Sequence, residues 1–153
     1  MIQVQRLNHA VLYVRDASRT ADFYRDVLGF ETVVEYPGAV FLRAGGSTNH
    51  HDLGLFSVGA SAPGPEGGRV GLYHLAWEVP TIRDLAAARD ALLKAGAHVG
   101  ESDHGSTKSV YAHDPDGNEF EVMWMVPRDQ WGEYEHEAPV APLDLDREIA
   151  RHG

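Results

Sequence analysis

The sequence contains no cysteine among its 153 residues. This absence excludes disulfide bonds and thiolate metal sites, and it fits a reducing cytoplasm, where we expect the protein to reside. No apolar run approaches the roughly 20 residues that a membrane span needs, and the N-terminus lacks the pattern of a secretion signal. Basic residues are also few. The 13 Lys and Arg against 23 Asp and Glu give a net charge of −10, which argues against nucleic acid and anionic membranes as partners.

The chain has more histidine than its length would suggest. Nine histidines are present, and histidine is the commonest metal ligand in proteins. The hydrophobic fraction of 43% and the charged fraction of 24% are ordinary for a globular protein, and the length suffices for one domain with a hydrophobic core.

Two segments of the sequence resemble each other. "LNHAVLYVRDASRTADFYRDVLGFETV" starts at Leu7 and "LYHLAWEVPTIRDLAAARDALLKAGAHV" starts at Leu72, so that His9 aligns with His74. Each copy reads as strand, helix and strand, with helices expected at about 18–28 and 82–95. The strands expected after these helices lie at about 31–36, 39–44 and 51–57 in the first half and 97–101, 108–113 and 118–125 in the second.

This repeat predicts an α+β fold of two tandem βαβββ modules, at about 5–58 and 70–126, joined by a Gly/Pro-rich connection at 59–71. We expect the modules to form one domain, 1–126, in which a cupped, half-barrel mixed sheet carries its helices outside. Residues 127–153 lie beyond the repeat and carry seven acids against three arginines. They are expected to be a peripheral, partly helical, acidic C-terminal extension.

The stretch "SVYAHDPDGNEFEVMW", residues 109–124, predicts two strands joined by a tight Asp-Pro-Asp-Gly turn. In the second strand Phe120, Val122 and Trp124 share one face, and Glu121 lies on the other face beside Met123. A carboxylate among bulky apolar residues is either at a solvent face or buried opposite a cation, which could be a side chain or a metal ion.

Three residues form a candidate metal-ligand set. His9 and His74 occupy matching places in the first strands of the two modules, and Glu121 lies in the last strand of the second. A twofold repeat that closes on itself brings such strands together around one cavity. Two histidines and one carboxylate there make a ligand set that leaves coordination positions open. The alternative is that each histidine is an ordinary core or interface residue.

The paired modules with His9, His74 and Glu121 resemble the vicinal-oxygen-chelate superfamily, which includes glyoxalases, bleomycin- and fosfomycin-resistance proteins and extradiol dioxygenases. Glyoxalase-type members bring a second carboxylate from the last strand of module one. Here that strand contains Leu53 and Leu55, and Asp52, the one acid nearby, has the opposite parity. Three protein ligands suit Fe(II), which must hold a catechol and dioxygen, although Mn, Zn or Ni could occupy the same site.

Further residues resemble the extradiol branch. His50-His51 precedes a Leu-rich strand, and His104, Val110-Tyr111 and the Asp-Pro-Asp-Gly turn precede Glu121. The resemblance implies that His51 is the acid/base residue, that Tyr111 hydrogen-bonds a substrate oxygen, and that His104 contacts the bound catecholate or lines the entrance. The alternatives are a solvated His-His pair and a half-buried strand tyrosine. His98, His113 and His136 are expected to be structural or surface residues.

The sequence therefore predicts a metal-dependent extradiol dioxygenase that uses O2 to open an aromatic diol. The chain resembles only the catalytic half of type I extradiol catechol dioxygenases, so its pocket is expected to be open or completed by a second subunit in a homodimer or higher homo-oligomer. Two alternatives are a non-oxidative metalloenzyme of the same fold, such as an isomerase, epimerase or thiol transferase, and a drug-binding resistance protein without catalysis.

Overall fold

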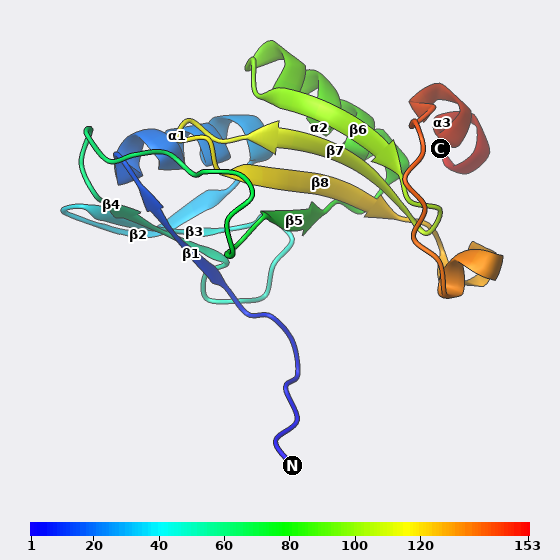
Figure 1. The fold of residues 1–153 in the computed structure, drawn as a ribbon, viewed down its shortest axis with the longest axis horizontal. Helices are drawn as coiled ribbons and strands as arrows, with labels where there is room; N and C mark the ends of the chain where they lie inside the picture. Colours follow the sequence, from blue (N-terminus) through cyan, green and yellow to red (C-terminus); the bar gives the residue numbers. More distant parts are fainter. The chain divides into compact units, whose positions relative to one another are not determined.

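The computed structural model describes residues 1–153, which divide into two compact units, Met1–Gly64 and Pro65–Gly153. The boundary falls within the connection expected at 59–71. Each unit has the βαβββ order that the repeat predicts (Figure 1). None of the helices combines the length and the apolar character needed to cross a bilayer.

The first unit, unit 1, is a four-stranded mixed sheet with one helix. Its strand order is β1-β4-β3-β2, in which β1 and β4 are parallel and the other pairs are antiparallel. Helix α1 packs against β3 and β4, and Tyr24, Leu42 and Leu53 are buried. The elements are β1 (Ala10–Val14), α1 (Ala17–Leu28), β2 (Glu31–Tyr36), β3 (Ala39–Arg43) and β4 (Leu53–Ser57).

The second unit, unit 2, repeats this topology with the order β5-β8-β7-β6 and a parallel β5–β8 pair. Helix α2 lies along one face of the sheet against β7 and β8 (Figure 1). The elements are β5 (His74–Glu78), α2 (Ile82–Lys94), β6 (His98–Asp103), β7 (Thr107–His113) and β8 (Glu119–Met125).

Local sequence signals set the ends of both long helices. The Asp16 side chain accepts hydrogen bonds from the first turn of α1, and Gly29 ends the helix with a φ of 70°, a left-handed conformation that glycine adopts without strain. The hydroxyl of Thr81 caps α2 by accepting from the N–H of Asp84 at 3.1 Å. These caps confirm the helices expected from the sequence to within one residue at each end.

The turn between β7 and β8 forms as its sequence predicts. A carboxylate oxygen of Asp114 accepts from the N–H groups of Asp116 at 2.8 Å and Asn118 at 3.0 Å, and Gly117 has a φ of 90°. The turn fixes the register of β8, in which Phe120 and Glu121 are both almost fully buried although they lie on opposite faces. Of the two alternatives for Glu121, a solvent face and a buried carboxylate, the structure shows the buried one.

The C-terminal residues belong to unit 2 and are partly helical, as expected. They pack more closely than a peripheral extension would. Glu148 is only 2% exposed, and Ala141 forms an isolated antiparallel bridge with Asp103 at the end of β6. The elements are the 3-10 turns η1 (Arg128–Gln130) and η2 (Gly132–Glu135), and helix α3 (Leu145–His152).

Candidate active site

His74 and Glu121 meet on the face of the unit 2 sheet opposite α2. The parallel register pairs His74 with Glu119 and Ala76 with Glu121. The side chains of His74, Glu119 and Glu121 therefore point to the same face of the sheet. Nε2 of His74 lies 3.1 Å from Oε2 of Glu121. Nδ1 of the same ring is buried, makes no hydrogen bond of normal length, and lies 3.5 Å from Oε1 of Glu119.

This arrangement fits a metal ion. Two ligand atoms at about 2.1 Å from a metal in neighbouring octahedral positions are about 3 Å apart, which is the separation of the two converging atoms. Imidazole nitrogen and carboxylate oxygen are both ligands for Fe, Mn, Zn and Ni. A ligating histidine also commonly directs its second nitrogen at a carboxylate, as His74 does toward Glu119.

Tyr111 and His104 complete the cluster in unit 2. Tyr111 lies opposite Glu121 in the β7–β8 ladder, and its ring centroid is 5.6 Å from that of His74. Its hydroxyl is 2.8 Å from Nε2 of His104. Burial, reinforced by the negative charge of Glu121, raises the pKa of Tyr111, so the phenol keeps its proton at neutral pH.

In unit 1 the structure brings His9 and His51 together. Their ring centroids are 4.5 Å apart, because Ala10 N–H donates to the Asp52 carbonyl and aligns the start of β1 with the residues before β4. Burial and the neighbouring rings of His9 and His50 lower the pKa of His51, which favours a neutral imidazole able to accept a proton.

The expected strand boundaries are wrong by a residue or two at these histidines. His9 precedes β1, which begins at Ala10, and His51 precedes β4, which begins at Leu53 rather than at 51. The ladder between β1 and β4 starts with the pair Ala10–Leu53, so both histidines lie just outside it. Outside a strand, side chains need not alternate between the two faces of the sheet, so His9 and His51 can point toward each other.

Asp52 is occupied by its own loop. Its carboxylate accepts from the N–H of Ala44 at 2.9 Å, the hydroxyl of Ser47 at 2.8 Å and the amide of Asn49 at 2.7 Å. Burial alone would raise the pKa of Asp52, but these donors hold it below its usual value. The residue therefore serves the loop as a charged acceptor, and Leu53 and Leu55 provide no ligand in its place.

The predicted site residues thus form two clusters. Unit 2 assembles His74, Glu121, Tyr111 and His104, and unit 1 assembles His9 with His51. Neither unit by itself groups three side chains that could hold a metal ion. The full set of His9, His74 and Glu121 draws on both units and stays a prediction.

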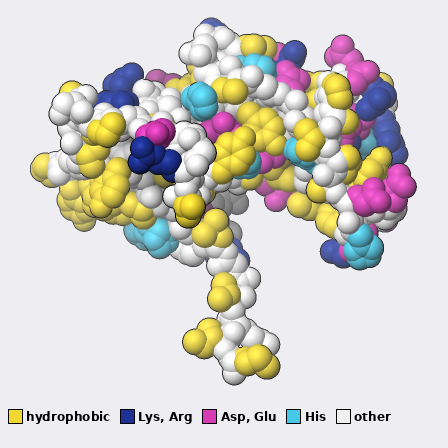
Figure 2. Space-filling model, viewed as in Figure 1, with side chains coloured by type: hydrophobic (Ala, Val, Ile, Leu, Met, Phe, Trp, Pro, Cys, Tyr) yellow, Lys and Arg dark blue, Asp and Glu magenta, His cyan; other side chains and the backbone are white.

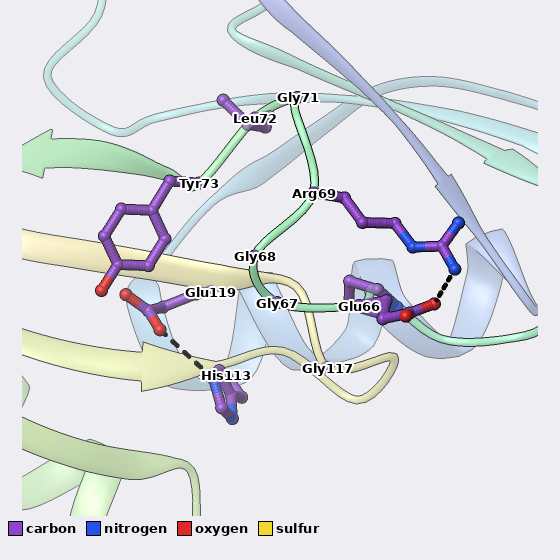
Figure 3. A pocket seen from close by; sticks show the side chains of 11 residues that line it. Glu66, Gly67, Gly68, Arg69, Gly71, Leu72, Tyr73, His113, Gly117 and Glu119 are labelled. Carbon is purple, nitrogen blue, oxygen red and sulfur yellow. Dashed lines mark ion pairs between the residues drawn. The ribbon is translucent and has the colours of Figure 1, made fainter.

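A cavity of about 600 Å³ lies in unit 2 and includes Glu119, the neighbour of His74, in its lining. Residues 65–69 and 71–73 line it together with His113, Gly117 and Glu119. Figure 3 shows Tyr73 and the Glu119 carboxylate at one end, with the Arg69–Glu66 ion pair at the other. The volume is in the range of small-molecule sites. Figure 2 shows hydrophobic, acidic and histidine side chains next to one another over the same sheet.

Sequence reasoning missed Glu119 as a site residue. Its side chain lies 3.5 Å from His74 and 3.6 Å from His113. The signal was present, since Glu119 shares the parity of Glu121 in a strand whose facing residue in β5 is His74. The contact between Glu119 and His74 depends on the register of the parallel β5–β8 pair, which the sequence does not specify.

The sequence of residues 6–122 matches the model of one protein family, described as the "Glyoxalase/Bleomycin resistance protein/Dioxygenase superfamily". The match covers both modules. The chain belongs to this superfamily. Its two sheets, each flanked by a helix and neither closed into a barrel, are the architecture that this membership implies.

Several relatives of this protein are named dioxygenases. It is 32% identical over 126 residues to the catechol-2,3-dioxygenase of Bacillus subtilis (strain 168), an alignment covering 82% of the chain and 43% of the relative. It is 35% identical over 128 residues to biphenyl-2,3-diol 1,2-dioxygenase 3 of Rhodococcus globerulus, covering 80% and 65%. It is 27% identical over 131 residues to a manganese-dependent 2,3-dihydroxybiphenyl 1,2-dioxygenase of Geobacillus genomosp. 3, covering 82% and 38%. The chain therefore spans less than two thirds of each relative.

Solved structures show the same fold with different titles. A glyoxylase/bleomycin resistance protein/dioxygenase domain from Frankia sp. EAN1pec superposes with a TM-score of 0.64 at 22% identity, covering 82% of the chain and 96% of that structure. A lactoylglutathione lyase from Agrobacterium tumefaciens superposes with a TM-score of 0.59 at 28% identity, covering 79% and 94%. The same fold thus occurs in a protein that is named a lyase rather than a dioxygenase.

Proposed function

We propose that the protein is a metal-dependent extradiol dioxygenase that opens a catechol-type ring with O2. The observation that carries the proposal is the convergence of His74 and Glu121 at 3.1 Å beside the Tyr111–His104 hydrogen bond. The names of the relatives at 27–35% identity support the same reaction class.

In this proposal His9, His74 and Glu121 hold the metal. Fe(II) is the favoured ion, and manganese is an alternative because one relative is named manganese-dependent. A metal ion held by these residues would bind the two oxygens of the diol and O2, and it would lower the pKa of the diol hydroxyls.

The chain's own residues then handle protons and orientation. His51 accepts a proton from the diol, a role open to it because its lowered pKa leaves the ring neutral before the transfer. Tyr111, whose raised pKa keeps its hydroxyl protonated at neutral pH, forms a hydrogen bond with a hydroxyl group of the substrate. His104 orients Tyr111 through the bond between Nε2 and the hydroxyl.

A non-oxidative metalloenzyme is the second candidate, favoured by the 28% identity to a lactoylglutathione lyase. It uses the same His74–Glu121 pair but needs no position for O2. The Asp52 carboxylate is hydrogen-bonded within its own loop, which argues against a fourth protein ligand from the start of β4. A binding protein without chemistry would leave the paired ligand positions unexplained.

We also propose that the chain assembles with a second copy. Val11, Tyr13 and Phe56 on the unit 1 strands are more than a third exposed, and apolar surface of this kind favours association. Light scattering after gel filtration tests this proposal, and a monomeric mass at micromolar concentration would contradict it.

The decisive experiment is anaerobic reconstitution of the full chain with Fe(II), followed by a panel of catechols in air. We expect a yellow ring-opened semialdehyde and one O2 consumed per diol. The exposed His136→Ala variant is the control and should match the wild type. Metal binding without colour or O2 uptake would favour the non-oxidative candidate, and the absence of metal binding would favour the binding protein.

A further inference from the structure

The segment 138–141, which lies outside the two repeated modules, runs along the end of β6. Asp103 N–H donates to the Ala141 carbonyl at 2.8 Å, and Ala141 N–H donates back to the Asp103 carbonyl at 3.0 Å. This pair of bonds holds the segment directly beside His104, the next residue along the chain from Asp103.

Both flanks of the segment are fastened to unit 2. Before it, the ring of Tyr134 packs so closely on Gly105 that a side chain at Gly105 would collide with it. After it, α3 brings the buried Glu148 to 3.7 Å from Lys108, whose ammonium group also lies 2.5 Å from Asp103. The segment is therefore held in place by contacts on either side of the bridge.

The bridged segment fixes the proton of His104. Nδ1 of His104 lies 2.8 Å from the carbonyl oxygen of Pro139. A carbonyl oxygen only accepts hydrogen bonds, so Nδ1 must carry the proton. In the neutral ring Nε2 is then an acceptor, and the Tyr111 hydroxyl at 2.8 Å donates to it.

We infer that the segment 138–141 is a positioning element of the active site, in which the Pro139 carbonyl sets the His104 tautomer and thereby directs the Tyr111 hydroxyl proton toward His104. The Tyr111 oxygen is left with lone pairs for the ligand, so it accepts a hydrogen bond from a substrate hydroxyl. This last step rests on the proposed function, whereas the tautomer does not.

The first test measures the tautomer directly. Nitrogen-15 NMR of the full chain with labelled histidine, without added metal, reports which ring nitrogen of His104 is protonated, and the signals missing in His104→Asn assign the ring. We expect a proton on Nδ1 and none on Nε2. A proton on Nε2, alone or together with one on Nδ1, overturns the inference whatever the enzyme's activity.

The second test loosens the segment. Ala141→Pro removes the N–H that donates to the Asp103 carbonyl. Asp146→Pro is the control, because it places a proline at an exposed position in the first turn of α3, outside the segment, where a helix tolerates proline. We expect Ala141→Pro to lose the unique His104 tautomer and Asp146→Pro to keep it. An unchanged tautomer in folded Ala141→Pro contradicts the inference.

Kinetics separate this inference from the proposed function. With an active enzyme we expect Ala141→Pro to lower kcat by about tenfold or more with little change in KM, the size of effect typical of groups that orient a functional residue. Equal kcat values for the two proline variants would contradict a role in positioning. A wild-type chain with the expected tautomer but no ring cleavage would refute the function and leave the tautomer assignment standing.

Discussion

Nε2 of His74 lies 3.1 Å from Oε2 of Glu121, across the first and last strands of unit 2. Glu121 is only 8% exposed, so its carboxylate needs a positive partner. A protonated histidine and a shared metal ion both satisfy that need. The two cases differ in one respect, which is whether the pair binds a metal ion when one is supplied.

We expect Glu121→Gln to abolish stable metal binding. The substitution keeps the shape of the side chain but removes the anionic oxygen, and loss of a ligand should weaken Fe(II) or Mn(II) affinity by at least about 100-fold. Titration calorimetry with Mn(II), supported by metal analysis after dialysis, measures the change. Full metal content and activity in the variant would show that the pair is only an ion pair.

Glu119→Gln should weaken the same metal site more mildly. Glu119 lies 3.5 Å from Nδ1 of His74 and orients the ring rather than binding the metal, so we expect about a tenfold loss of affinity. The exposed Glu78 of β5 offers a charge-matched control, since Glu78→Gln removes one negative charge from the same unit without touching His74. Equal losses of metal affinity in the two variants would show that the effect comes only from the change in net charge.

The sequence predicted the residues whose positions follow from the repeat and from strand alternation. The matching places of His9 and His74 and the parity of Glu121 follow from those two rules, and in the structure Glu121 is buried and lies beside His74. The hydrogen bond between His104 and Pro139 could not be predicted in this way. It depends on an isolated bridge between Asp103 and Ala141, which has no periodic pattern in either segment.

The Asp103–Lys108 pair should make unit 2 sensitive to acid. Burial alone would raise the pKa of Asp103, but the Lys108 ammonium group, the Gly105 N–H and the Arg147 charge hold it below its usual value of 3.8. A lowered pKa means that the charged form stabilises the folded state above about pH 4, and this contribution is lost as the pH falls through the folded pKa.

We therefore expect Asp103→Asn to lower the free energy of unfolding by about 3 kcal/mol at neutral pH, because it leaves a buried lysine short of its partner. The difference from wild type should shrink as the pH falls below the usual value of 3.8 toward the lowered pKa of the folded carboxyl group. Urea unfolding followed by tryptophan fluorescence measures both values. The exposed Asp129→Asn serves as control, and a difference independent of pH would contradict the assignment.

His51→Ala should spare the metal and slow the reaction. The ring is neutral at the start of the proposed cycle because burial and the neighbouring His9 and His50 lower the pKa of His51. Removing a general base costs about 10²–10⁴ in kcat, whereas the metal affinity should stay within about twofold of wild type.

The adjacent His50→Ala discriminates between the two histidines, since we expect its loss of kcat to be far smaller. Stopped-flow turnover combined with metal titration measures both effects. Loss of metal in His51→Ala would make His51 a ligand, and a larger kcat loss in His50→Ala would move the acid/base role to its neighbour.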